Sequence, residues 1–177
     1  MRFGYKLYMA LLAAFTLPIL LTPFLAAQGN PAAPALYGFY GLSCHQYVSR
    51  SICYFPEAGL GDCTSGPGLA PYRLYSVEKD GLAGYPFPVC ARDVGIYSAA
   101  LLGGALLFFL RKTDGDVVLH PIWFALALVP IALDGGTQLI GLRESTNSLR
   151  LLTGAIAGFA FPFFCVPLLN RAFPDKK

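Results

Sequence analysis

Four of the five cysteines fall between the first two apolar segments of the chain, and their spacing allows more than one kind of chemistry. They are Cys44, Cys53, Cys63 and Cys90. An even number of cysteines in an oxidising compartment favours two disulfides, and four cysteines can pair in three ways. The simplest pairing joins Cys53 to Cys63 across a short loop and Cys44 to Cys90. Cys165, inside the last apolar segment, is expected to pack as a small hydrophobic side chain.

A metal site is the second possibility, because His45 follows Cys44 directly and Asp93 follows Cys90 by three residues. Zinc accepts thiolate, imidazole and carboxylate ligands, so these four side chains could hold a metal ion as a cofactor. Adjacent Cys and His ligands are unusual, however, and Cys-x-x-Asp is a weak motif. Redox-active thiols are a third possibility, and the spacing alone leaves all three open.

A second group of polar residues interrupts the apolar segments. Asp134 lies about 10 Å inside the outer end of an apolar helix, and Gln138 follows on the same face. An ionised side chain at that depth costs several kcal/mol unless it is paired or hydrated, which makes it a candidate for function. We expect it to meet other polar side chains near the outer membrane surface. The candidate ligand-binding residues are Arg50, Arg92, Asp134, Gln138, Arg143, Asn147 and Arg150.

Two interpretations of this group remain open. In the first, the arginines bind an anionic lipid headgroup or another small anion through paired hydrogen bonds, with Asp134 as a base or orienting group. In the second, Asp134 pairs with Arg150 or Arg92. Gln138 and Asn147 then hydrogen-bond between helices, and the group only locks the bundle. The protein would in that case be an accessory or structural subunit of a membrane complex.

These residues must be positioned by helices that cross a membrane. Hydrophobic residues make up 55% of the 177 residues and charged residues only 13%, against about 25% charged in a soluble domain. Four stretches are long and apolar enough to span a hydrocarbon core about 30 Å thick: 7–27, 94–110, 117–140 and 151–169. The prediction is an all-α fold, a polytopic bundle of about four transmembrane helices that forms one membrane domain over residues 1–177.

Lysine and arginine residues set the predicted orientation. They precede the first span and follow the second and fourth spans, three segments that share one side of the membrane if there are four spans. The positive-inside rule makes this side cytoplasmic and places both termini there, in a multi-pass protein of the cell membrane. The first span is alternatively a cleaved signal peptide, although its apolar run exceeds the usual length of about 7–15 residues. The basic residues are Arg2, Lys6, Arg111, Lys112, Arg171, Lys176 and Lys177.

Residues 28–93 are predicted to form a long extracytoplasmic loop. A loop of this length in a compact protein is usually functional or disordered, and its many tyrosines and phenylalanines argue against disorder. We expect these rings to lie at the headgroup level of the membrane, and residues 35–50 to form a short helix there. The net charge of +3 gives no support for nucleic-acid binding.

Four segments carry motifs in a fixed order: Ser-Cys-His-Gln at 43–46 with Arg50, Val-Cys-Ala-Arg-Asp-Val-Gly-Ile-Tyr at 89–97, Asp-Gly-Gly-Thr-Gln at 134–138, and Arg-Glu-Ser-Thr-Asn-Ser-Leu-Arg-Leu-Leu-Thr-Gly at 143–154. In this order they resemble the small prokaryotic membrane proteins of domain-of-unknown-function family 2085. The resemblance covers residues 42–158. It implies a shared site and names no activity.

One position departs from the family pattern, because the second cysteine of the family's Cys-x-x-Cys is Asp93 here. A carboxylate can still ligate a metal ion, whereas thiol–disulfide exchange would be lost at this position. Cys53 and Cys63 look like additions to the pattern that bridge to each other. The sequence thus predicts an integral membrane protein with a polar site at the outer leaflet. A bound lipid headgroup or metal ion, an accessory role and thiol redox chemistry all remain open.

Overall fold

The structure is a computed structural model and describes residues 1–64, 75–110, 112–115, 118 and 120–174. Arg111, Lys176 and Lys177, which contribute to the predicted orientation, lie outside the described residues, as does Val117 at the predicted start of the third span. The chain divides into two compact units. Unit 1 comprises Met1–Thr16, Gly95–Ser145 and Leu149–Lys177, and unit 2 comprises Leu17–Val94 and Thr146–Ser148.

Four helices of the described chain are long and apolar enough to cross a membrane. They are α1 (Phe3–Ala27), α3 (Ala91–Phe109), α4 (Pro121–Leu139) and α5 (Asn147–Ala172). Each overlaps one of the four stretches predicted from the sequence. The boundaries differ because apolarity locates the middle of a span, whereas polar residues such as Asn147 and Asp93 belong to the first turns of the actual helices. The mostly helical structure is consistent with a membrane helix bundle.

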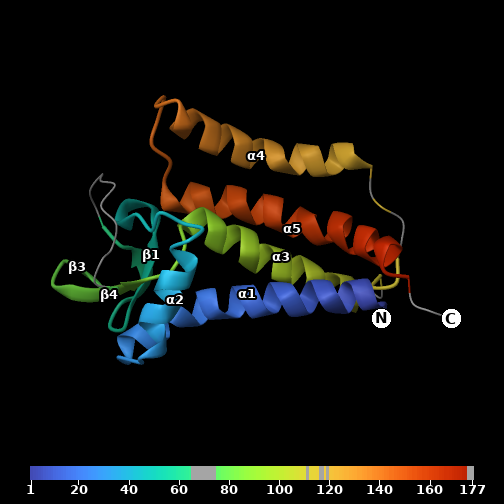
Figure 1. Ribbon diagram of the computed structural model, residues 1–177. Helices are drawn as coiled ribbons and strands as arrows, with labels where there is room; N and C mark the ends of the chain where they lie inside the picture. The colour runs from blue at the N-terminus through green and yellow to red at the C-terminus, as the bar shows by residue number, and fades with distance from the viewer. Residues whose placement is uncertain (65–74, 111, 116–117, 119, 175–177) are drawn as a thin grey trace. The chain divides into compact units, whose positions relative to one another are not determined.

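In unit 1, α3 and α5 lie side by side (Figure 1), and glycines let their backbones approach closely. A Cβ atom at Gly158 of α5 would collide with the backbone of Ile96, and one at Gly103 of α3 would collide with the carbonyl of Phe159. Small residues at helix crossings are the usual means of tight packing in membranes. These glycines therefore fix the contact between the two helices.

The helix α4 lies at one edge of unit 1 (Figure 1), and protein covers little of its surface. Only 6% of its most apolar stretch of 18 residues is buried, compared with 39% for the corresponding stretches of α3 and α5. Its contact with α5 includes a stack of Phe124 on Phe164, with ring centroids 5.2 Å apart. Trp123 and Leu133 are exposed on other faces. Exposed apolar side chains along a helix of this length suit a hydrocarbon environment.

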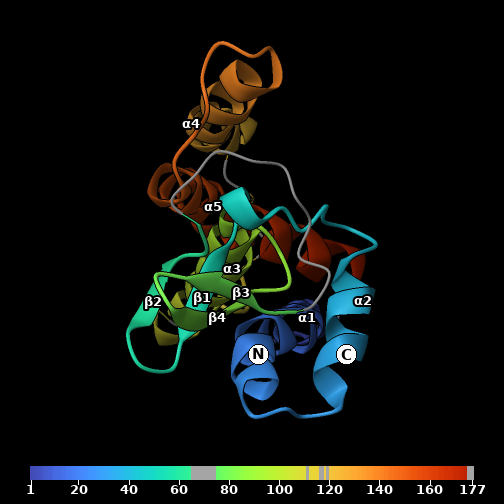
Figure 2. The ribbon, with the colours of Figure 1, turned by 90° about the vertical axis from the view of Figure 1, so that its left-hand side faces the viewer.

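Unit 2 contains an antiparallel sheet, so the prediction of an all-α fold was incomplete. The described part of this unit has four strands in the order β2-β1-β4-β3, labelled in Figure 2. They are β1 (Ile52–Phe55), β2 (Gly59–Asp62), β3 (Val77–Lys79) and β4 (Leu82–Pro86). Strands of three to five residues are too short to give a clear alternation of apolar and polar side chains. The sequence therefore indicated only an irregular loop.

The helix predicted over residues 35–50 is shorter and begins earlier. The structure has α2 (Ala32–Tyr40), followed after a bend by the 3₁₀ turn η1 (Val48–Arg50). Tyr37 and Tyr40 of α2 are each only 1% exposed. The Tyr37 hydroxyl donates a hydrogen bond of 2.6 Å to the carbonyl of Pro86. These two rings therefore face the interior of unit 2.

Cys53 and Cys63 form a disulfide, which confirms the shorter of the two predicted pairings. The bond closes the hairpin of β1 and β2, and both cysteines are buried with Phe55 in one cluster. The ring of Phe55 also covers Gly84 of β4, where a Cβ atom would collide with it. A small sheet needs such a core, because short hairpins are at best marginally stable alone.

Candidate metal site and charged group

Cys44, Cys90 and Asp93 come together in unit 2. Their two Sγ atoms and one carboxylate oxygen all lie within 4.8 Å of one another. The Cys90 thiol donates a hydrogen bond of 3.2 Å to Asp93 Oδ2. All three residues are partly exposed, so a small solute can reach them. Three groups that ligate transition metals in their ionised forms thus share one small volume.

The start of α3 positions two of these side chains. Cys90 directly precedes the helix, and its carbonyl accepts the hydrogen bond from the Val94 amide at 3.0 Å. Asp93 follows in the first turn, three residues later, which places both side chains at the same end of the helix. The partial positive charge of a helix N-terminus also favours anionic side chains there. This local geometry is why the spacing alone indicated the pair.

Gln46 positions the third side chain, Cys44. The side-chain amide of Gln46 donates hydrogen bonds to the carbonyls of Tyr37, at 2.8 Å, and Pro88, at 3.0 Å. Its backbone has a φ of 53°, a left-handed conformation that is uncommon for residues other than glycine. The Cys44 amide donates to the carbonyl of Tyr40 at 3.0 Å. The turn that carries Cys44 is therefore bound both to α2 and to the segment just before Cys90.

His45, the fourth predicted ligand, is not part of this group. Its ring stacks on Tyr47 with centroids 5.5 Å apart and planes 11° from parallel. The guanidinium of Arg50 lies over the same tyrosine, 5.5 Å from the ring centroid. Adjacent residues point their side chains in different directions in an extended turn, so His45 cannot readily follow Cys44 into one coordination sphere. The predicted set of four becomes a set of three.

The two thiols of the group differ in acidity. The hydrogen bond between them lowers the pKa of Cys44 to about 7, against the opposing effect of burial. The same hydrogen bond, together with burial and the negative charge of Asp93, raises the pKa of Cys90. Cys44 is therefore the thiol that loses its proton first as the pH rises. Both residues are free thiols, so the second predicted disulfide is not formed in this structure.

In unit 1, Asp134 has Arg143 as its ion-pair partner. Arg143 Nη2 lies 2.8 Å from Asp134 Oδ1. The Asp134 side chain is 2% exposed and that of Arg143 is 43% exposed, so the pair reaches from the helix interior to the surface. Arg143 Nε also donates to the hydroxyl of Thr137 at 3.2 Å. A buried carboxylate on α4 is thus neutralised by the loop that follows the helix.

Glu144 links two further predicted residues. Its Oε2 accepts a hydrogen bond of 2.8 Å from the side-chain amide of Gln138. The same oxygen lies 3.2 Å from Arg150 Nη2. Arg150 is 3% exposed and Glu144 is 64% exposed. Because Gln138 is on α4 and Arg150 is on α5, this carboxylate joins the two helices through their short connection.

Asn147 connects the first turn of α5 to the sheet of unit 2. Its side-chain amide donates to the carbonyl of Ser51 at 3.2 Å and to Asp62 Oδ1 at 3.0 Å. The residue is 7% exposed. Two hydrogen bonds from a buried amide to β1 and β2 neighbours indicate a structural role. Asn147 is therefore a weaker candidate for ligand binding than the sequence suggested.

The predicted ligand-binding residues are divided between the two units. Asp134, Gln138, Arg143 and Arg150 belong to unit 1, where the contacts above join them. Unit 2 holds the other three, with Arg92 beside Asp93 in the first turn of α3. Hereafter the "charged group" means Asp134, Arg143, Glu144 and Arg150. The expectation that all seven predicted residues meet at one height in the membrane stays a prediction.

Sequence reasoning missed Gln46, Asp62 and Glu144 as partners. Glu144 had a usable signal, because it is the acid in a short connection between two helices that carry Gln138 and Arg150. Gln46 belongs to the Ser-Cys-His-Gln motif. Its two hydrogen-bond acceptors are backbone carbonyls, and every residue has one, so the sequence could not identify them. Asp62 meets Asn147 only because β2 exists, and that strand was not predicted.

Comparisons with other proteins identify the family. A family model described as "Predicted membrane protein (DUF2085)" matches residues 81–164. "Uncharacterized protein MJ1492" of Methanocaldococcus jannaschii is 34% identical over 180 residues, which cover 97% of each chain. The chain belongs to the DUF2085 family. The resemblance noted in the sequence is thereby confirmed.

Another relative supports the same assignment to DUF2085. An "Uncharacterized protein" of Methanothermobacter thermautotrophicus is 42% identical over 90 residues, 50% of this chain and 73% of that protein. No solved structure gives a significant match. The segment matched by the DUF2085 model contains Cys90, Asp93 and the charged group, whereas Cys44 precedes it. Family membership and four apolar helices support a location in the membrane.

Proposed function

We propose that Cys44, Cys90 and Asp93 bind a transition metal ion, with Zn²⁺ as the best-matched ion. The observation that carries the proposal is the presence of three ligand atoms within 4.8 Å of one another. Ligands of one tetrahedral zinc ion, at about 2.0–2.3 Å from the metal, are separated by about 3.3–3.8 Å. Each separation between the three atoms therefore needs to shorten by at most about 1.5 Å. Thiolate and carboxylate donors suit Zn²⁺ better than Mg²⁺ or Ca²⁺.

The ligand set favours an open site rather than a closed structural one. Structural zinc sites have four protein ligands, whereas catalytic sites have three and leave one position for water or a substrate. His45 stacks on Tyr47 and does not complete the set. The partial exposure of all three residues gives water access to the fourth position. Such an open position would allow the bound ion to activate water. It would also allow the ion to be transferred to another molecule.

Metal content of the purified protein tests the proposal. We expect about one zinc ion per chain after exposure to ZnSO₄ and removal of excess metal. Cys44→Ser and Asp93→Ala should each lose most of it. Cys165→Ser is the matched control, because Cys165 is also a free cysteine but lies in α5. Retention of the metal in Cys44→Ser would refute the site.

A reversible disulfide is a second candidate function, favoured by the direct contact of the free thiols Cys44 and Cys90. Oxidation would form one S–S bond and release two protons, and the two electrons would reduce the disulfide of a partner protein to two thiols. Mass spectrometry after alkylation separates the candidates. A Cys44–Cys90 linkage that persists in zinc-loaded preparations supports redox chemistry, whereas two alkylated cysteines released by chelation support metal binding.

The orientation proposed from the sequence is that both termini are cytoplasmic and the metal site is on the outer side. Lys112, which follows α3, and Arg171, in the last turn of α5, are described basic residues that support it. Single cysteines at two exposed positions provide the test. A membrane-impermeant maleimide should label Glu57→Cys in intact cells and Lys112→Cys only after the membrane is opened. The reverse pattern would invert the topology.

For the charged group we propose a structural lock rather than a site that binds a purely anionic ligand. Arg143 and Arg150 each contact a carboxylate, so an anionic lipid headgroup would have to displace Asp134 or Glu144. Paired charges between helices are the usual way in which membrane proteins tolerate ionised residues. An accessory subunit would need no more than this lock. The metal site, in contrast, requires a ligand from outside the protein.

A further inference from the structure

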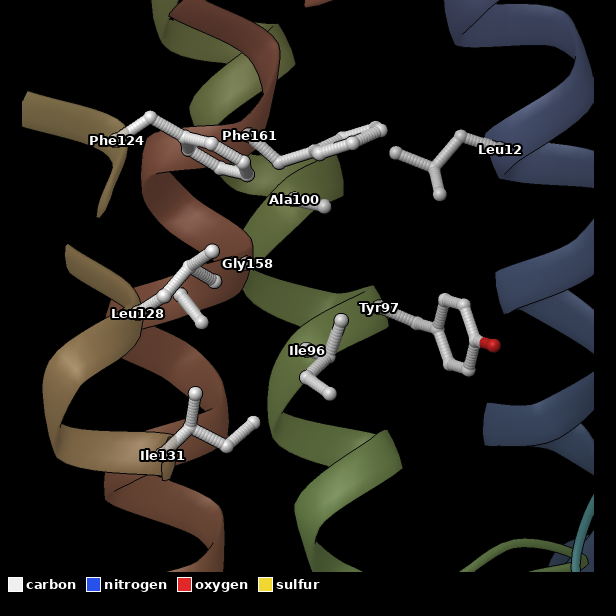
Figure 3. A pocket seen from close by; sticks show the side chains of 10 residues that line it. Leu12, Ile96, Tyr97, Ala100, Phe124, Leu128, Ile131, Gly158 and Phe161 are labelled. Atoms are coloured by element: carbon white, nitrogen blue, oxygen red, sulfur yellow. The ribbon is translucent and has the colours of Figure 1, made fainter. Parts of the chain in front are cut away.

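Unit 1 contains an apolar cavity of about 230 Å³ between its membrane-crossing helices. Figure 3 shows Phe124, Leu128 and Ile131 of α4 on one side of it and Leu12 of α1 on the other, and Gly158 and Phe161 of α5 also line it. The three residues of α4 follow each other at intervals of four and three, so they form one face of the helix. The cavity thus lies against one face of α4, the least covered of the four long helices in the described chain.

A space of this size and lining can hold an apolar occupant. Protein interiors pack at the density of organic crystals, and an apolar cavity of about 150 Å³ in another protein stays dry and binds benzene. The cost of an empty cavity grows with its volume. The helices around this one are those that cross the membrane, so the hydrocarbon chains of lipids are the molecules next to it.

The charged group of the same unit lies further along two of the helices that line the cavity. On α4, Asp134 follows Ile131 by one turn, about 4.5 Å along the axis. On α5, Arg150 and the cavity residue Ala157 are seven residues apart and share a face. An occupant that runs along α4 would therefore have its chain among apolar side chains and its head beside two arginines and two carboxylates.

The charge of that group selects the head. Arg143 and Arg150 are balanced by Asp134 and Glu144, and the best exposed members are Arg143, at 43%, and Glu144, at 64%. A purely anionic head would be attracted by one of these and repelled by the other. A zwitterionic head offers its phosphate to Arg143 and its ammonium group to Glu144, so it matches both charges.

We propose that the cavity is a binding site for one acyl chain of a zwitterionic phospholipid of the ethanolamine type, whose head lies at Arg143 and Glu144. The site uses unit 1 alone and does not depend on the metal site. Binding of a chain between α4 and α5 would supply the packing that α4 lacks. A lipid held in this way is a structural ligand with a defined position, unlike the exchanging lipids around the bundle.

The test uses phosphatidylethanolamine with a diazirine in the middle of one acyl chain, at low mole fraction in phosphatidylcholine nanodiscs that contain the whole protein. After illumination, labelled residues are mapped by mass spectrometry. We expect adducts at Leu128 and Ile131 to exceed those at Val129 and Leu133 of the same helix by about fivefold, a difference of about 1 kcal/mol in occupancy. Equal labelling of the two faces would mean ordinary lipid contact and would overturn the proposal.

Two substitutions fill the cavity from opposite walls, so that misfolding of one variant does not decide the result. Ala100→Phe on α3 and Leu128→Phe on α4 should each reduce labelling at Ile131 by about fivefold. Leu102→Phe is the matched control, because Leu102 is on α3 but is 66% exposed. Wild-type labelling in both filled variants would refute the chain site. Equal labelling by a phosphatidylglycerol probe would refute the choice of head.

Discussion

The two polar clusters of this protein are built on opposite principles. In unit 2, two thiols and a carboxylate share a volume less than 5 Å across, and their ionised forms would repel one another. In unit 1, each arginine of the charged group contacts a carboxylate, so the group is neutral as a whole. Groups that repel one another when ionised are stabilised either by keeping their protons or by binding a cation, whereas a balanced group needs neither. The first arrangement therefore points to a ligand, and the second to a contact between helices.

Burial sharpens this difference. The three residues of the metal site are all partly exposed, and no pair among them is hidden from solvent. The charged group has a buried member and an exposed member in each pair, Asp134 with Arg143 and Arg150 with Glu144. A buried charge is tolerated only if its partner stays in place. The charged group should therefore be sensitive to substitution through folding, and the metal site through binding.

The largest effect is expected at Asp93 itself. Asp93→Ala should weaken Zn²⁺ binding by more than about 100-fold, because even the loss of a hydrogen-bond partner of a ligand costs about 10–100-fold. Asp93→Cys should strengthen it, since a third thiolate is a softer donor than a carboxylate. Competition with a chromophoric chelator measures both affinities.

Substitution in the charged group provides the control for that experiment. Glu144→Ala removes a carboxylate of similar size from unit 1, and we expect it to leave the Zn²⁺ affinity within about twofold of the wild type. An equal loss of affinity in Asp93→Ala and Glu144→Ala would show that the two clusters do not differ in the way described.

The second effect concerns the reactivity of Cys44 in metal-free protein. A thiol with a pKa of about 7 is half ionised at pH 7, about 50 times more than a thiol with a pKa near 9. Because the thiolate is the reactive form, alkylation by iodoacetamide should accelerate between pH 6 and about 8 and then level off. Cys90, whose pKa is raised, should react only at higher pH. Rates are followed by mass spectrometry of peptides.

Zinc supplies the control for the alkylation experiment. Coordination removes the thiolate from attack, so added Zn²⁺ should protect Cys44 while leaving the rate at Cys165 unchanged. An alkylation rate at Cys44 that rises only above pH 8.5, or is indifferent to Zn²⁺, would contradict the assignment of this thiol.

A third, smaller effect separates positioning from ligation. Gln46→Met keeps the length of the side chain but removes both hydrogen bonds to Tyr37 and Pro88. We expect Zn²⁺ to bind about tenfold more weakly, with the ligands still present but less well placed. Gln46→Gly also removes these hydrogen bonds, but glycine adopts the left-handed backbone conformation of this position without strain. We therefore expect Gln46→Gly to bind Zn²⁺ at least as tightly as Gln46→Met does. Unchanged affinity in both variants would mean that Gln46 does not position Cys44.

The site could be predicted from the sequence only where its geometry is local. Cys90 and Asp93 are three residues apart at a helix start, so the spacing itself implied contact. Their meeting with Cys44 depends on the turn at Gln46, whose hydrogen bonds go to main-chain carbonyls 9 and 42 residues away. His45 was included because it is adjacent in sequence, which is poor support for adjacency of side chains.

The fold, like the site, could be predicted only where a local sequence signal determines it. Long apolar stretches predicted all four long helices, because a span of 19 residues or more gives a strong signal. The sheet was not predicted, because its strands are only three to five residues long. They are stabilised by the disulfide and by the packing of Phe55 on Gly84, and these contacts are not apparent from the sequence. The contact of Asp134 with Arg143 was not predicted either, because Arg150 or Arg92 was the expected partner and the path of the loop after α4 cannot be deduced from the spacing.

The smallest effect, and the one most specific to the charged group, is the coupling between Asp134 and Arg143. Removal of Asp134 leaves an arginine that is 43% exposed and can be hydrated, so Asp134→Asn should cost about 1–2 kcal/mol rather than the 3–5 of a fully buried pair. Arg143→Met leaves the carboxylate, which is 2% exposed, without this partner, and should cost more. The thermal midpoint in detergent measures each variant.

The double variant decides between a lock and a binding site. If the pair serves only to neutralise Asp134, Asp134→Asn with Arg143→Met should be more stable than Arg143→Met alone, with a coupling of about 1 kcal/mol or more. That rescue follows because the buried charge and its counter-charge leave together. Additive losses, with stability restored by an added inorganic anion, would instead mean that Arg143 binds that anion rather than neutralising Asp134, and the contrast between the two clusters would disappear.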